Sequence, residues 1–285
     1  MIKPKPSLLQ IVGTKSKFYS RFLTSQFRTL PDFIIIGAAK SGTTSLYNYL
    51  TQHHQVLPCF RKEVHYFDRK FNNGIYWYKS HFPLRFKKIN TSGEKLISGE
   101  SSPYYLYHPL SPKRVAAVLP AAKFFIVLRN PVDRAISNYN HRVKAGQEQL
   151  PIEIAFEKEA ERIAGEEKKL YSGEINFSFE HYYHSYITRG IYHIQIRRWQ
   201  ELFSKEQFLI LESSELFDRP EVAFLKVLGH LRLPHHKVKF EIHNKGDVSE
   251  YKVLSTAFRN KLIEFYKPHN EKLFELTGMR FDWNK

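Results

Sequence analysis

The sequence is short of cysteine, of long apolar runs and of acidic residues, and each shortage narrows what the protein can be. Cys59 is the only cysteine among 285 residues, so no disulfide can form within the chain and nothing indicates an oxidising compartment. Apolar runs such as residues 7–12 fall far short of the roughly 20 residues that cross a membrane. We therefore expect a cytoplasmic protein with no signal peptide and no transmembrane segment.

The shortage of acidic residues leaves a strongly basic chain. Asp and Glu total 28 against 44 Lys and Arg, which gives a formal net charge of +16, and residues 1–31 contain no acidic residue at all. Such a charge attracts nucleic acid, acidic glycans, lipid head groups and phosphorylated cofactors alike. We predict that residues 1–30 form a basic arm or an ordinary helix; the alternative is an amphipathic helix that makes weak contact with a membrane surface.

Apolar runs alternate with helix-like stretches along the rest of the chain. The runs at 33–36, 95–99, 123–129 and 207–213 are apolar on both faces, as in strands buried between helices. This alternation predicts an α/β fold with a mainly parallel sheet, formed by residues 31–285 as a single domain. The expected helices lie at 41–53, 110–120, 130–146, 152–170, 190–203 and 255–278.

Two segments rich in aromatic residues and histidine, 60–86 and 171–190, do not fit this alternation. Long connections in a compact α/β domain often bind ligands, so we predict that they contact an acceptor. The alternative is that their aromatic side chains only pack the loops onto the domain.

The stretch "FIIIGAAKSGTT" at 33–44 has the pattern of an anion-binding loop between a strand and a helix. Unpaired N–H groups at a helix start attract anions, and Gly37 and Gly42 permit a sharp turn close to the ligand. Lys40 precedes the second glycine, whereas a nucleotide triphosphatase loop has the order G-x-x-x-x-G-K-[ST]. The loop adds a cation and several hydroxyl donors, Thr43, Thr44 and Ser45.

A second motif, "FFIVLRNPVDRAISNYNH" at 124–141, combines a strand end with a helix start. Arg129 ends the buried strand, where α/β sheets place their ligand crevice, and Ser137 follows two helical turns later. An arginine with a hydroxyl suits a fixed phosphate group. We expect Arg134 to form a structural ion pair; the alternative is that it faces a ligand.

The segments "PDFIIIGAAKSGTTSLYNYL" and "FIVLRNPVDRAISNY" resemble the two cofactor motifs of sulfotransferases that use 3′-phosphoadenosine 5′-phosphosulfate (PAPS). The resemblance is greatest to the heparan sulfate (glycan) sulfotransferase branch and its bacterial relatives. It implies a P-loop-like three-layer sandwich with a central sheet between helices, and 3′-phosphoadenosine 5′-phosphate as the product. The residues that it implies for the cofactor are Lys40, Ser41, Gly42, Thr43, Thr44, Ser45, Arg129 and Ser137, with Tyr192, Lys245 and Gly246 as weaker candidates.

The segment "RKEVHYFD" at 61–68 resembles the part of the glycan 3-O-sulfotransferases that carries a catalytic Glu, a His and an Asp. The matching positions are Glu63, His65 and Asp68. We predict that Glu63 takes the acceptor's proton, that His65 orients Glu63 or donates to the sulfonate, and that Asp68 binds the acceptor or a nearby Lys. Glu63 could instead serve only in a salt bridge with Arg61 or Lys62, and Glu100 and His108 are rival bases.

The reaction implied by the resemblance is transfer of a sulfuryl group to a hydroxyl or amine. Lys40 would stabilise negative charge on the bridging oxygen of the leaving group, and no metal is expected. The animal enzymes' disulfide pair and N-terminal membrane anchor are missing, which indicates a bacterial-type enzyme. The acceptor is a glycan, a lipid or a small metabolite.

Two other functions compete with this interpretation. One is a P-loop kinase, and the other is a non-catalytic binder of acidic polymers, favoured by the charge. No base-stacking or groove-reading motif accompanies the basic residues, so we expect no nucleic-acid partner.

Overall fold

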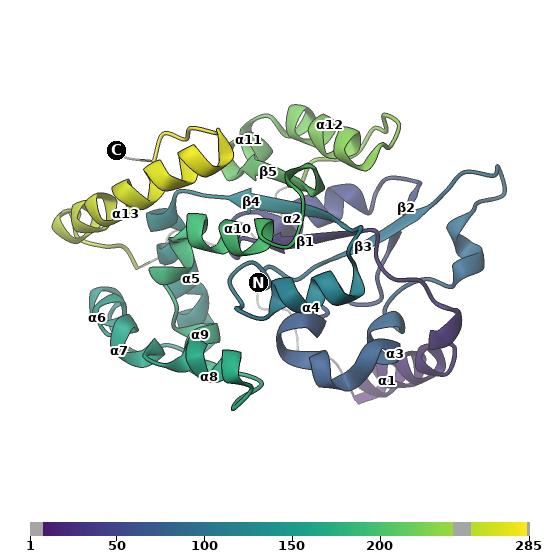
Figure 1. Cartoon of the computed structure of the whole chain (residues 1–285), viewed down its shortest axis with the longest axis horizontal. Coiled ribbons are helices and arrows are strands. Elements are labelled where there is room, and N and C mark those ends of the chain that lie inside the picture. Colours follow the sequence, from purple (N-terminus) through teal and green to yellow (C-terminus); the bar gives the residue numbers. More distant parts are fainter. Residues whose placement is uncertain (1–7, 242–251, 284–285) are drawn as a thin grey trace.

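The computed structural model describes residues 8–241 and 252–283. Within these ranges, five parallel strands form one sheet in the order β2-β3-β1-β4-β5 (Figure 1). Because β1 lies between β3 and β4, the chain turns to opposite sides of β1, and such a switch point opens a crevice at the carboxyl ends of the strands. The strands are β1 (Phe33–Gly37), β2 (Val56–Pro58), β3 (Ile97–Ser101), β4 (Lys123–Leu128) and β5 (Phe208–Glu212).

Helices cover both faces of the sheet and make three layers (Figure 1). On one face lie α2 (Thr43–Leu50), α11 (Ser213–Asp218) and α12 (Pro220–Leu231). On the other face lie α4 (Ser111–Val118), α10 (Tyr192–Gln200) and α13 (Thr256–Thr277). The remaining helices are α1 (Leu8–Leu23), α3 (Gly74–Lys79), α5 (Pro131–Lys144), α6 (Ile152–Glu157), α7 (Glu159–Ile163), α8 (Glu166–Ser172) and α9 (Phe179–Tyr183).

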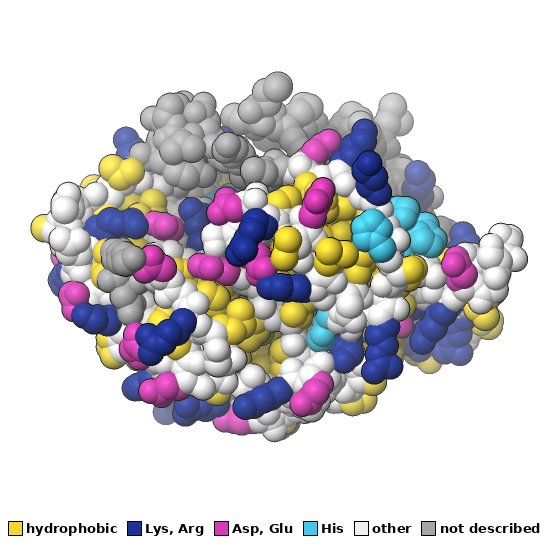
Figure 2. Space-filling view, turned by 90° about the horizontal axis from the view of Figure 1, so that it is seen from above, with side chains coloured by type: hydrophobic (Ala, Val, Ile, Leu, Met, Phe, Trp, Pro, Cys, Tyr) yellow, Lys and Arg dark blue, Asp and Glu magenta, His cyan; other side chains and the backbone are white. Residues whose placement is uncertain are grey.

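The net positive charge does not form one field over the whole surface. On the face seen in Figure 2, Lys and Arg side chains alternate with Asp and Glu, and apolar patches lie between them. On this face the basic side chains are therefore interspersed with acidic ones.

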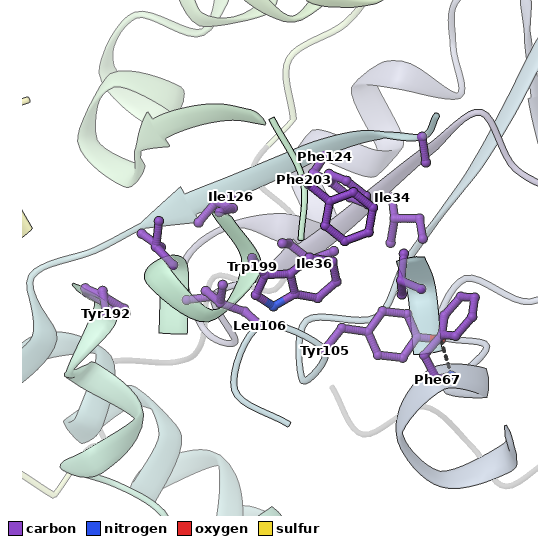
Figure 3. Packing of buried hydrophobic residues seen from close by; sticks show 14 of the residues in the cluster. Ile34, Ile36, Phe67, Tyr105, Leu106, Phe124, Ile126, Tyr192, Trp199 and Phe203 are labelled. Atoms are coloured by element: carbon purple, nitrogen blue, oxygen red, sulfur yellow. Dashed lines mark hydrogen bonds between the residues drawn. The ribbon is translucent and has the colours of Figure 1, made fainter. Parts of the chain in front are cut away.

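The core explains why the strands are apolar on both faces. Alternate residues of a strand point to opposite sides, so Ile34 and Ile36 pack with Phe124 and Trp199 in one cluster (Figure 3). Phe33 packs in the second cluster, on the α2 side of the sheet. Gly99 of β3 faces this ring, and a Cβ added there would lie 2.3 Å from it, so the register of β1 against β3 requires a glycine.

The predicted α/β class and three-layer sandwich are confirmed, and several boundaries differ. The strand expected at 95–99 begins at Ile97, and the short β2 was not predicted. The single helix expected at 152–170 is three helices, partly because Gly165 has φ 75° and interrupts the helix between α7 and α8. The N-terminal segment contains the helix α1, Leu8–Leu23.

Candidate active site

A cavity of about 810 Å³ opens at the carboxyl ends of the central strands. Its walls come from the loop after β1, the segment 62–65, one face of α5 and the residues that follow β5. These segments lie far apart in the sequence, and the switch point of the sheet brings them together.

The loop after β1 forms one wall through Lys40, Gly42, Thr43 and Thr44. Gly42 has φ 102°, and a Cβ there would lie 2.9 Å from the ring of Phe217, so both conformation and space require a glycine. The helix α2 begins directly at Thr43, so its first N–H groups have no partner within the helix. Two other predicted cofactor residues, Ser41 and Ser45, are fully buried and do not line the cavity.

Lys40 is the cation of this loop. Burial and the nearby charges of Arg142 and Arg129 lower its pKa to about 8. Arg129 follows β4, lines the same cavity and donates from Nη1 to the Lys40 carbonyl at 3.4 Å. The two predicted cofactor cations therefore lie in one wall of the site.

Tyr192, a weaker cofactor candidate, lies behind this wall. Its side chain is almost completely buried in the core and does not line the cavity (Figure 3). Its hydroxyl donates to the Arg129 carbonyl at 2.9 Å. Tyr192 therefore holds Arg129 in place from the core side.

One face of α5 forms a second wall. Asp133, Ser137 and His141 are spaced four residues apart, so they share a helix face, and all three line the cavity. Asn130 caps the helix by accepting from the N–H of Val132 at 3.0 Å. The helix thus brings Ser137, predicted from the sequence, into the same cavity as Arg129.

The expected ion pair of Arg134 is wrong. Arg134 is fully buried and donates to the backbone carbonyl of Tyr186, and no carboxylate in the described residues lies within salt-bridge distance of it. The guanidinium of Arg134 thus joins α5 to the segment after α9 through a backbone oxygen.

Glu63, His65 and Asp68 form a connected group at the cavity. Nε2 of His65 lies 3.3 Å from Oε2 of Glu63, and Nδ1 lies 2.7 Å from Oδ2 of Asp68. Glu63 and His65 line the cavity, whereas Asp68 is buried behind His65 and does not. Asp68, predicted to bind the acceptor, therefore lies in the position of a partner that fixes the imidazole.

The charges of this group follow from its contacts. Burial alone would raise the pKa of Glu63, but the hydrogen bond from His65 and the charge of Lys62 lower it to about 2. Burial alone would lower the pKa of His65, but Asp68 and Glu63 raise it to about 9. At neutral pH Glu63 is thus a carboxylate and His65 an imidazolium.

Lys62 joins this group to the anion-binding loop. Its Nζ donates to Oγ1 of Thr44 at 2.5 Å and lies 3.5 Å from Oε1 of Glu63. The alternative of a Glu63–Lys62 salt bridge is thus present, yet 44% of the Glu63 side chain stays exposed in the cavity. Lys62 was not predicted as a site residue from the sequence, although its position next to Glu63 indicated that it lies close to the site.

The two rival bases lie away from the cavity. Glu100 has no exposed surface, and burial raises its pKa to about 7. His108 is also buried, and burial lowers its pKa to about 3. Neither lines the cavity, whereas Glu63 does.

The segment 171–190 contributes residues that the sequence did not single out. Tyr182 and Arg189 line the cavity, together with Arg142 from α5. The guanidinium of Arg142 lies 5.4 Å from the ring centre of Tyr182, within the range of a cation–π contact. Both aromatic segments therefore reach the cavity, although many of their rings, such as Tyr66, pack in the core.

Some expectations fall outside what the structure describes. Lys245 and Gly246 lie within 242–251, beyond the described residues. Across 8–241 and 252–283, no three His, Cys, Asp or Glu side chains are grouped so that they could hold a metal ion. No helix in the same ranges has the length and apolar character needed to cross a membrane.

The chain is similar in sequence to known sulfotransferases. Residues 30–283 match the family model described as the sulfotransferase domain. The chain is 26% identical to the membrane-associated sulfotransferase kil1 of Dictyostelium discoideum, over 89% of the chain and 66% of that protein. It is 26% identical to human heparan sulfate glucosamine 3-O-sulfotransferase 5, over 95% of the chain and 79% of that protein.

A solved structure shares the fold. The crystal structure of a sulfotransferase from Alicyclobacillus acidocaldarius matches 90% of this chain and 100% of its own chain, with 27% identity and a TM-score of 0.69. The sheet and its surrounding helices are therefore those of a bacterial sulfotransferase structure.

Proposed function

The chain belongs to the sulfotransferase domain family, and we propose that it transfers a sulfuryl group from PAPS to a hydroxyl or amine of a glycan acceptor. The observation that carries the proposal is the shared cavity, where Lys40 and Arg129 lie in one wall and Glu63 and His65 approach from another. Lys40 and Arg129 would bind a donor that carries phosphates at both ends. Glu63 and His65 would serve an acceptor that loses a proton.

Unneutralised positive charge in the cavity fits a phosphorylated donor. Lys40, Arg129 and Arg142 line the cavity, and none has a carboxylate within 4.0 Å in the described part of the chain. Burying cations without carboxylate partners is unfavourable unless an anion binds there. We propose that the loop after β1 holds the 5′ end of the donor and that Arg129 and Ser137 hold its 3′-phosphate.

The protein's residues would stabilise the charge on the leaving group and take one proton from the acceptor. The Lys40 ammonium would stabilise the negative charge that develops on the leaving oxygen, so it lowers the barrier more than it tightens binding. The Glu63 carboxylate would accept the acceptor's proton, and the His65 imidazolium would hold Glu63 in place. A carboxylate with a pKa of about 2 is a weak base, which suits a reaction in which breaking of the donor bond leads.

The glycan acceptor is supported by the relatives and by the cavity wall. The human relative is named for transfer to glucosamine of heparan sulfate. Tyr104 and Tyr182 line the acceptor side near His65, and aromatic rings offer flat apolar surfaces beside their hydroxyls. Lipids and small hydroxylated metabolites are the alternatives that the experiment must separate.

The test is an acceptor screen read by mass. Purified protein is incubated with PAPS and a panel of glycans, lipids and small alcohols, and we expect one sulfonate to be added to a glycan. Lys40→Ala and Glu63→Gln should each lower kcat by about 10²- to 10³-fold, since one removes a cation at the developing charge and the other the base. The exposed pair Lys95→Ala and Glu161→Gln serves as the matched control.

Two outcomes would contradict this proposal. A wild-type protein that adds sulfonate to no member of the panel would contradict the glycan acceptor. Full activity in both cavity variants would contradict the assigned roles.

We also propose weak contact between α1 and an anionic membrane surface, in a bacterial-type cytoplasmic protein. The outward face of α1 carries Tyr19, Phe22 and Leu23, of which Leu23 is 82% exposed. Lys15 and Lys17 are exposed on the same helix, which has no acidic residue in its first turn. Apolar and basic side chains on one helix suit the boundary between lipid head groups and acyl chains.

A further inference from the structure

Glu100 is a buried carboxylate that the proposed reaction does not use. Three hydroxyl groups donate to it: Tyr78 to Oε1 at 2.7 Å, Tyr105 to Oε1 at 3.2 Å and Ser102 to Oε2 at 2.7 Å. In its ionised form Glu100 only accepts hydrogen bonds, so in that form each of the three hydroxyl protons points toward it. The lone pairs of these hydroxyls are then free to accept from other donors.

The Ser102 hydroxyl also accepts a hydrogen bond from the backbone of His65. The distance from the His65 nitrogen to the Ser102 Oγ is 3.1 Å. His65 has φ 56°, a left-handed conformation that is unfavourable for a residue with a side chain and that persists only where the surroundings hold it. The Glu100–Ser102 pair is one such support.

The Tyr105 hydroxyl also accepts hydrogen bonds from the backbone, here from Tyr66 and Phe67. Its hydroxyl accepts from the N–H of Tyr66 at 2.7 Å and from that of Phe67 at 3.3 Å. The backbone N–H groups of residues 65–67 thus donate to two hydroxyls, and Glu100 sets the orientation of both. The arrangement is buried throughout, so no solvent replaces a lost partner.

We propose that Glu100 is a positioning residue of the active site. It orients the two hydroxyls that hold the backbone of residues 65–67, and it thereby aims the His65 imidazole at Glu63, 3.3 Å away. The inference rests on the proposed function, in which Glu63 takes the acceptor's proton. A displacement of about 1 Å at such a group can cost up to about 100-fold in rate.

The experiment compares three variants that each alter one part of this network. Glu100→Gln keeps the shape but makes one side of the group a donor, so a hydroxyl on that side loses the acceptor that fixes the direction of its proton. Tyr105→Phe removes the hydroxyl that holds Tyr66 and Phe67. Tyr78→Phe is the matched control, because it removes a hydroxyl from Glu100 that makes no recorded hydrogen bond to residues 65–67.

We expect kcat to fall by about 10- to 100-fold in Glu100→Gln and Tyr105→Phe, with the donor KM unchanged. Tyr78→Phe should keep most of the wild-type kcat. Amide hydrogen exchange of a peptide covering 63–70 should be faster in the first two variants only, while exchange in β1 and β4 stays as in the wild type. If Glu100→Gln does not fold, Tyr105→Phe and Ser102→Ala carry the comparison.

The inference is overturned if all three variants lose kcat equally, or if exchange of 63–70 in Glu100→Gln and Tyr105→Phe equals that of the wild type. The exchange measurement needs no acceptor. A wild-type protein without sulfuryl transfer would therefore contradict the proposed function, while the exchange result still decides whether Glu100 holds the loop.

Discussion

The charge of Lys40 is set by its neighbours and not by the residue type alone. A free lysine has a pKa near 10.5, whereas burial with Arg142 and Arg129 nearby lowers that of Lys40 to about 8. The lowered value reflects burial first and the charges of Arg142 and Arg129 second, and an anion bound nearby would favour the protonated form. The pH range in which the residue works is therefore a property of the site.

The activity should fall on the alkaline side. The reaction needs protonated Lys40, so we expect kcat/KM to be steady near neutrality and to decline as pH rises through about 8. In Lys40→Arg the cation persists, and the decline should move to about 9, where His65 loses its proton. Relative kcat/KM profiles of the two proteins test this, and an unchanged midpoint in Lys40→Arg would show that another group causes the decline.

At the scale of the element, α5 acts as a rigid carrier for one wall of the cavity. Its cap, Asn130, directly follows Arg129, and Ser137 and Arg142 project into the cavity from the following turns. Loosening the start of the helix would therefore disturb several ligand contacts together. The N-terminal helix α1 is different, because it packs on the body through Phe18 and Arg21 and leaves an apolar face exposed.

Removing the cap of α5 should affect both stability and the site. Asn130→Ala should lower the free energy of unfolding by about 1 kcal/mol, because two N–H groups lose their acceptor. It should also weaken binding of 3′-phosphoadenosine 5′-phosphate in calorimetry. Ser255→Ala removes the cap of α13 and should cost similar stability without a change in affinity. Equal affinities in both variants would refute the carrier role of α5.

The outward face of α1 should bind anionic lipid. We expect the protein to co-sediment with vesicles containing phosphatidylserine, and Phe22→Ser with Leu23→Ser to weaken this binding by about tenfold, since exposed apolar groups would no longer enter the lipid. Leu225→Ser on α12 alters another exposed apolar residue and is the control. Loss of binding in the control as well would argue against a specific face.

At the scale of the whole molecule, the cavity exists only because distant segments converge at one edge of the sheet. The loop after β1, the segment 62–65, α5 and the residues after β5 each supply part of it. A ligand that contacts several of these segments binds the folded chain and not the unfolded one. Binding of the donor or its product should therefore raise global stability.

Ligand stabilisation separates the sulfotransferase from a kinase. At 100 times its Kd, 3′-phosphoadenosine 5′-phosphate should raise the free energy of unfolding by about 2.7 kcal/mol. ATP with magnesium at the same concentration should have little effect, because Lys40 precedes Gly42 and β4 ends beside Arg129 instead of a metal-binding Asp. Thermal unfolding with each ligand measures this, and stabilisation by ATP with magnesium alone would favour phosphoryl transfer.

The local parts of this protein were predictable from the sequence because they depend on near neighbours. A buried strand followed by Gly37, Lys40 and Gly42 specifies a strand–turn–helix anion loop wherever it occurs. The same holds for Arg129, which follows β4 at the start of α5. Periodicity thus predicted the α/β class and four of the strands, and the two motifs with their family resemblance predicted both halves of the proposed donor site.

Only the tertiary structure decided which of the remaining polar residues share the cavity. The sequence favoured Glu63 as the base and left Glu100 as a rival, and packing leaves Glu63 partly exposed in the cavity and encloses Glu100 among hydroxyls. Asp68 proved to lie behind His65, and Arg142 proved to line the cavity, since burial and direction depend on contacts between segments far apart in the chain. Residues close in the sequence determined which strand, loop or helix each segment forms. The convergence of distant segments at the edge of the sheet determined which side chains can meet a substrate.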